Sequence, residues 1–109
     1  MTSIDLHYPS FMEVGMREKG IEQKLVIEVK RRGGICPKFT SPSFDGMPDR
    51  LVLLPYGKVG FVEVKTPGKQ PRPLQLARIN LIRGLGFHVF VLDEEEQIGG
   101  ILDEIQNTV

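Results

Sequence analysis

The sequence predicts an α/β fold, with a small mixed β-sheet flanked by helices in the order α-β-β-β-α-β-α. Apolar residues recur at helical spacing in three stretches, and short β-branched runs lie between these stretches. Clusters of glycine and proline separate the runs, as expected of turns. The chain of 109 residues is long enough to bury one core, so a single domain is expected.

The first expected helix covers residues 17–32, and a glycine pair ends it. Residues 1–16 contain Pro9 and Gly15 and show no clear period, which indicates an irregular N-terminal arm ahead of a domain over residues 17–109. The apolar residues at helical spacing in this helix are Ile21, Leu25, Val26 and Val29.

Three strands are expected next, over residues 35–40, 50–54 and 59–65. Pro37 has no N–H group to donate to a ladder, which weakens the first of these strands or places it at a sheet edge. The turn-rich segment 41–48 predicts a loop, and "PYGK" predicts a turn that pairs the other two strands antiparallel.

A helix over residues 73–83 is expected to begin at Pro73, because the first turn of a helix does not need the missing N–H. The run "FHVFVL" at 87–92 predicts a strand buried within the sheet. Residues 94–107 carry apolar side chains at helical spacing, although a glycine pair weakens the helical propensity there.

Several classes of protein are excluded by composition. The apolar runs are too short to span a membrane, and the N-terminus lacks a signal-peptide pattern, so an intracellular, cytoplasmic protein is expected. Cys36 has no second cysteine to pair with. With only His7 and His88 besides, a Cys/His metal site is not expected, and Cys36 is interpreted as a small core residue.

The net charge is zero, with 14 basic and 14 acidic residues, so global charge does not indicate a nucleic-acid-binding protein. The distribution is uneven, however, because residues 29–44 and 64–92 contain bases and no acids. These stretches predict either an ordinary solvated face or a surface that holds phosphates.

The third strand carries charge where a buried strand would carry apolar residues. Glu63 and Lys65 share one face of that strand, about 6.6 Å apart along it. Burying such a pair is unfavourable unless other groups pair with it. Antiparallel pairing with the preceding strand brings Asp49 to the same end, so two carboxylates and a lysine are expected to converge.

Two carboxylates at one point repel each other, and a divalent cation relieves that repulsion. Hard oxygen ligands without histidine or cysteine favour Mg²⁺ or Mn²⁺. A metal of this kind beside a lysine supports phosphodiester hydrolysis, in which the lysine orients or deprotonates the attacking water.

Two further residues have both a structural and a functional interpretation. Glu22 lies on or beside the apolar face of the first helix, as a border glutamate or as a metal-binding or water-holding carboxylate. Gln75, in the first turn of the second helix, either reaches the site or is an exposed helix residue.

Pro48-Asp49 followed by Glu63-Val64-Lys65 resembles the PD-(D/E)xK nuclease motif. The sequence around this motif makes the resemblance more specific, because it contains four further features in order. These features are "GMPDR", a glycine-containing link, a glutamine that opens a helix and a glycine before the last strand. Over about residues 21–92 the chain looks like the VRR-NUC (virus-type replication-repair nuclease) domain family.

This resemblance implies a restriction-endonuclease-like core and a role for each residue of the motif. Asp49, Glu63 and the backbone carbonyl of Val64 would hold Mg²⁺ or Mn²⁺, with Glu22 as a further candidate ligand. The residues implied to act in catalysis are Asp49, Glu63, Lys65, Glu22 and Gln75.

The resemblance also implies a metal-dependent endodeoxyribonuclease that is similar to Holliday-junction resolvases. Such an enzyme would act on branched DNA as a homodimer. No organic cofactor and no membrane partner are expected. A phage-encoded member would work in the cytoplasm of the host cell. The residues expected to bind nucleic acid are Lys38, Arg50, Lys69 and Arg72, although Arg50 can equally pair with an acid.

Two other functions are compatible with the sequence. One is a catalytically silent nucleic-acid-binding module on the same fold, which the intact motif argues against. The other is an interaction domain in which Glu63 and Lys65 only form a salt bridge.

Overall fold

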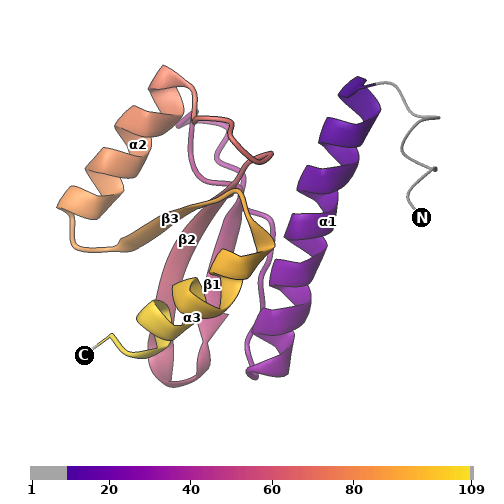
Figure 1. Cartoon of the computed structure of the whole chain (residues 1–109). Helices are drawn as coiled ribbons and strands as arrows, with labels where there is room; N and C mark the ends of the chain where they lie inside the picture. Colours follow the sequence, from indigo (N-terminus) through magenta and orange to yellow (C-terminus); the bar gives the residue numbers. More distant parts are fainter. Residues whose placement is uncertain (1–9, 109) are drawn as a thin grey trace.

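The computed structural model describes residues 10–108, and it shows a three-stranded sheet between helices (Figure 1). Side chains are described from residue 17 onward. The elements in chain order are α1 (Ser10–Arg31), β1 (Arg50–Leu54), η2 (Pro55–Gly57), β2 (Lys58–Val64), α2 (Pro73–Gly84), β3 (His88–Leu92), η3 (Glu95–Gln97) and α3 (Ile98–Gln106).

The sheet has the order β1-β2-β3, so β2 is the central strand. β1 and β2 form the expected antiparallel hairpin, in which Arg50 pairs with Val62 and Leu54 with Lys58. β3 adds to β2 in parallel after the crossover through α2. The sheet is therefore mixed, and the expected α/β class is confirmed.

The helices cover opposite faces of the sheet, as Figure 1 shows for α1 and α2. Side chains from α1 and α3 pack with Val52, Val62 and Val64 in the larger core cluster. α2 packs through Ile79 and Ile82 against the other face. Because alternate residues of β2 point to opposite faces, Phe61 and Glu63 lie on the α2 side.

Glycine is required at one position of β2 because α3 packs very closely there. A Cβ atom added to Gly60 would clash with the side chain of Ile105. The glycine pair at 99–100 does not prevent α3 from forming, since its apolar face is buried in the core. The buried side chains of α3 are Ile98, Ile101, Leu102 and Ile105.

Three sequence-based boundaries differ from the structure. α1 begins at Ser10, so the irregular arm expected over residues 1–16 is wrong for residues 10–16, and residues 1–9 lie outside the described part. The strand expected over 35–40 is reduced to two isolated bridges beside β1, because Pro37 cannot donate to a ladder. The last helix is shorter than 94–107, since η3 precedes it.

None of the helices in the described residues is long and apolar enough to cross a membrane. Cys36 is buried in the larger cluster, as expected. Burial raises the pKa of its thiol to about 11, so the thiol is protonated at neutral pH and the residue acts as a small apolar side chain.

Candidate active site

The charged end of β2 forms the candidate site. Glu63 is 1% exposed, and its Oε2 lies 3.2 Å from Nζ of Lys65. Lys65 follows the last residue of β2, and its N–H donates to the carbonyl of Leu92 at 2.8 Å, which extends the pairing with β3. The backbone around both side chains is therefore held on the central strand, which limits their movement.

Asp49 precedes β1 and turns toward the same end of β2. Its Oδ2 accepts a hydrogen bond from the N–H of Val64 at 3.0 Å. Burial raises the pKa of Asp49, this N–H lowers it, and the negative charge of Glu22 raises it again. The expected meeting of Asp49, Glu63 and Lys65 is thus present in the structure.

Glu63 has one satisfied and one unsatisfied carboxylate oxygen. Its Oε2 accepts a hydrogen bond from Nε2 of Gln75 at 2.8 Å in addition to the contact with Lys65. Its Oε1 is buried without a hydrogen-bond partner among the residues that the structure describes. Burial raises the pKa of Glu63, the charge of Asp49 raises it further, and Lys65 opposes this shift.

Gln75 connects the start of α2 to this carboxylate. It is buried, and its Oε1 accepts a hydrogen bond from the N–H of Arg72 at 2.9 Å while its Nε2 donates to Glu63. The alternative that Gln75 is an exposed helix residue is therefore wrong. Both ends of the side-chain amide are used, so its orientation is determined.

Glu22 reaches toward the site from α1 but is bound to Arg50. Their Oε2 and Nε atoms are 2.7 Å apart, and Nη1 of Arg50 donates to the carbonyl of Cys36 at 2.8 Å. The Arg50 side chain is only 14% exposed. Of its two interpretations, pairing with an acid is the one observed, and a phosphate contact would have to displace Glu22.

Replacing Arg50 by alanine is expected to lower the free energy of unfolding by about 2 kcal/mol or more, because it leaves a largely buried carboxylate without its partner. Urea denaturation measures this loss. Arg31→Ala is the matched control, since Arg31 pairs with Glu28 at the surface and such pairs contribute about 1 kcal/mol or less. Equal losses in the two variants would contradict the structural role of Arg50.

The oxygen atoms at the site fit a hard divalent cation. No three Asp, Glu, His or Cys side chains gather as a metal-binding group within the part of the chain that the structure describes. The oxygen donors that the structure brings together are instead the carboxylates of Asp49 and Glu63. The buried, unpaired Oε1 of Glu63 is the observation that favours a cation, because a bound ion would satisfy it.

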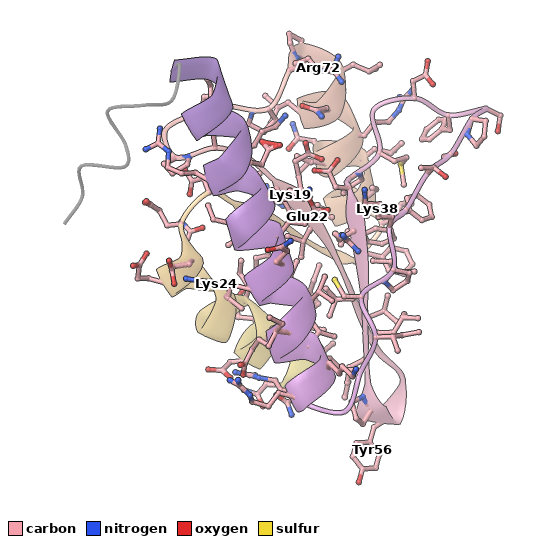
Figure 2. All side chains as sticks on the ribbon, turned by 90° about the vertical axis from the view of Figure 1, so that its right-hand side faces the viewer. Lys19, Glu22, Lys24, Lys38, Tyr56 and Arg72 are labelled. Carbon is pink, nitrogen blue, oxygen red and sulfur yellow. The ribbon has the colours of Figure 1, made fainter. Side chains whose placement is uncertain are left out.

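The other residues expected to bind nucleic acid are basic side chains at the surface. Lys38, Lys69 and Arg72 are exposed, as a phosphate-binding role requires. Figure 2 shows Lys19 and Glu22 on the side of α1 that faces Lys38, whereas Lys24 points to the other side of the helix. Lys19 lies three residues before Glu22, which puts both on one helix face.

Comparisons with known proteins agree with this geometry, although no family model matches the chain. A phage protein named "Putative nuclease p44", from Acyrthosiphon pisum secondary endosymbiont phage 1, is 51% identical over 81 residues, or 74% of this chain and 87% of the phage protein. A solved structure described as "VRR_NUC domain" superposes with a TM-score of 0.75 at 30% identity, over 80% of this chain and 95% of that one. These similarities establish that the chain belongs to the VRR-NUC family of nuclease domains.

Proposed function

We propose that this nuclease is a divalent-metal-dependent DNA endonuclease that hydrolyses phosphodiester bonds in branched DNA, including four-way junctions. The observation that supports metal dependence most directly is the buried, unpaired Oε1 of Glu63 beside Asp49. Two carboxylates with raised pKa values at one point are unfavourable in an empty site, and a divalent cation would relieve both charges.

The carboxylates of Asp49 and Glu63, with the carbonyl of Val64, would hold Mg²⁺ or Mn²⁺. When bound, such a cation neutralises the negative charge that develops on the scissile phosphate. Lys65 lies 3.2 Å from Glu63, so its ammonium group is placed to orient the attacking water from the same side. Gln75 keeps Oε2 of Glu63 occupied by a hydrogen bond, which leaves Oε1 for the cation.

Glu22 has a supporting role in this proposal. Because Arg50 neutralises it, it adds little net charge to the site, yet it remains close enough to raise the pKa of Asp49. If the pair opens when DNA binds, Glu22 becomes a further ligand or holds the attacking water, and Arg50 is released to contact phosphate.

A cleavage assay on defined DNA substrates tests the proposal. Four-way junctions, flaps, splayed arms and linear duplexes are incubated with Mg²⁺, Mn²⁺ or EDTA, beside the Lys65→Ala variant. We expect faster cleavage of the branched substrates, no cleavage in EDTA and strongly reduced cleavage by the variant. Equal cleavage of linear duplex would refute the preference for branched DNA. Binding without cleavage under every condition would support a catalytically silent module.

A homodimer is the second part of the proposal. α2 and the turn after it carry five large apolar side chains that are 46–68% exposed, which is unusual for a helix that faces only solvent. A second copy of the chain would cover the end of this surface formed by Leu81, Leu85 and Phe87, and two symmetric sites could address two strands of a junction. These exposed residues are Leu74, Leu76, Leu81, Leu85 and Phe87.

The dimer is tested by light scattering at micromolar concentration. We expect twice the monomer mass for the natural chain and the monomer mass for a Leu81→Glu, Leu85→Glu double variant, because a dimer interface does not tolerate unpaired carboxylates. Tyr56→Glu, at an exposed turn on the far end of the hairpin, is the control and should remain dimeric. A monomer mass for the natural chain would refute the proposal.

A further inference from the structure

The loop over residues 40–48 begins and ends beside the catalytic Asp49. The N–H of Phe39 donates to the carbonyl of Asp49 at 2.8 Å, which closes the base of the loop. Phe44, near the loop tip, is five residues from Asp49 and so lies at most about 17 Å from it. This reach corresponds to the rise of about five nucleotides along one DNA strand.

α2 holds this loop in place. Gly46 has a φ of 87°, and a Cβ atom there would lie 2.8 Å from Cγ of Leu74, so the loop backbone packs tightly on the helix. Nε of Arg78 donates to the carbonyl of Asp45 at 2.7 Å. Because the same helix supplies Gln75 to the active site, the distance between the loop and the site is set by one rigid element.

Phe44 presents an oriented aromatic surface on this loop. The guanidinium carbon of Arg78 lies 3.8 Å from the centroid of its ring, which holds the ring from one side. The residue nevertheless remains 40% exposed. Core burial therefore does not account for an aromatic side chain at this position, whereas a planar ligand that stacks on the exposed part of the ring would.

We propose that Phe44 stacks on an unpaired nucleobase within about five nucleotides of the scissile phosphate and thereby determines the preference of this nuclease for branched DNA. The inference rests on the proposed function, in that DNA is the substrate. Aromatic side chains stack on bases without regard to sequence, but the bases of a continuous duplex are already stacked on each other. A flap or splayed end offers a free base close to the cleaved strand, and the branch point of a junction interrupts base stacking there.

The surrounding charge supports the same ligand. Lys38 precedes the loop and Arg72 lies just before α2, and both side chains are exposed (Figure 2). These cations would hold phosphates on either side of the stacked base. The ring is already fixed by Arg78, so little conformational entropy is lost when a base stacks on it.

The test uses the Lys65→Ala protein in Ca²⁺, so that the DNA stays intact. The fluorescent base analogue 2-aminopurine is placed at the unpaired position of a flap. In a second substrate it is placed at the matching position of a continuous duplex. We expect binding to change the 2-aminopurine fluorescence in the flap only. Phe44→Leu should abolish this change and weaken flap binding by about 5- to 150-fold relative to duplex binding. Phe44→Trp should restore both.

Tyr56→Leu is the matched control, since Tyr56 is an exposed aromatic residue at the opposite end of the hairpin, and it should behave like the natural chain. Thermal unfolding of each variant separates stacking from folding. If Phe44→Leu weakens flap and duplex binding equally, or leaves the fluorescence change intact, the inference is overturned. If the chain binds as expected but the natural protein cleaves no DNA, the proposed function fails while the stacking role stands.

Discussion

Asp49→Asn is expected to lower the rate of DNA cleavage by about 10³-fold or more in Mg²⁺, since loss of a ligand charge removes several kcal/mol of stabilisation from the transition state. The substitution is nearly isosteric, and the oxygen of the new amide can still accept the hydrogen bond from the N–H of Val64. Folding should therefore be retained, so the loss of cleavage can be assigned to chemistry.

Lys65→Ala is expected to reduce cleavage by about 10² to 10⁴-fold, the range typical of a lost proton-transfer or orienting group. Single-turnover rates at saturating DNA measure both effects, and DNA affinity is measured in parallel. Lys30→Ala is a suitable control, because Lys30 is an exposed lysine near the end of α1. If Asp49→Asn and Lys65→Ala both cleave at the natural rate, the proposed mechanism is wrong.

Glu63→Gln is expected to have two opposite effects: loss of cleavage and a higher melting temperature of the metal-free protein at neutral pH. The pKa of Glu63 is raised by burial and by the charge of Asp49, so the ionised carboxylate destabilises the fold. The neutral amide removes this penalty. A change of only 1 kcal/mol would shift the melting temperature of a domain of this size by about 4–8 °C, which calorimetry resolves.

The pH dependence follows from the direction of the shift. Above the raised pKa of the folded protein, the natural chain has the full penalty of the buried charge. As pH falls through that pKa toward the unfolded value of about 4.3, the folded state binds the proton first and the penalty is lost. The stability difference between Glu63→Gln and the natural chain should therefore be largest at neutral pH and should close toward pH ~4.

Metal addition gives a second measurement on the same variant. Mg²⁺ or Mn²⁺ should raise the melting temperature of the natural chain, because a ligand that binds only the folded state stabilises it. The increase should be absent in Glu63→Gln and present in the control Glu104→Gln, which changes an exposed glutamate of α3. Equal stabilisation of all three proteins would argue against a metal at Glu63.

Sequence periodicity predicted the fold well where local pattern and tertiary packing agree. The hairpin of β1 and β2 follows from two apolar runs around a short turn, and its antiparallel register brings Asp49 to the charged end of β2. The strand predicted over residues 35–40 is wrong, because two isolated bridges replace it. The predicted start of the first helix is also wrong, because α1 extends back to Ser10 through residues of weak periodicity.

The partners of long polar side chains could not be predicted from spacing alone. Arg50 had two equal interpretations, and only the approach of α1 to β1 shows that it binds Glu22. The burial of Gln75 likewise depends on how α2 lies against the sheet. These pairings join elements far apart in the chain, and the free energy that selects them arises from desolvation in the folded state.

The sequence by itself determined the α/β class, the central hairpin and the identity of the three charged residues at the site, because strand alternation and turn chemistry are local properties of the chain. Only the tertiary structure decided that one oxygen of Glu63 is buried without a partner among the described residues, while Gln75 and Lys65 hold the other. It also decided that Arg78 of α2 contacts the ring of Phe44 and the carbonyl of Asp45, since burial and distance exist only once the helices have packed on the sheet.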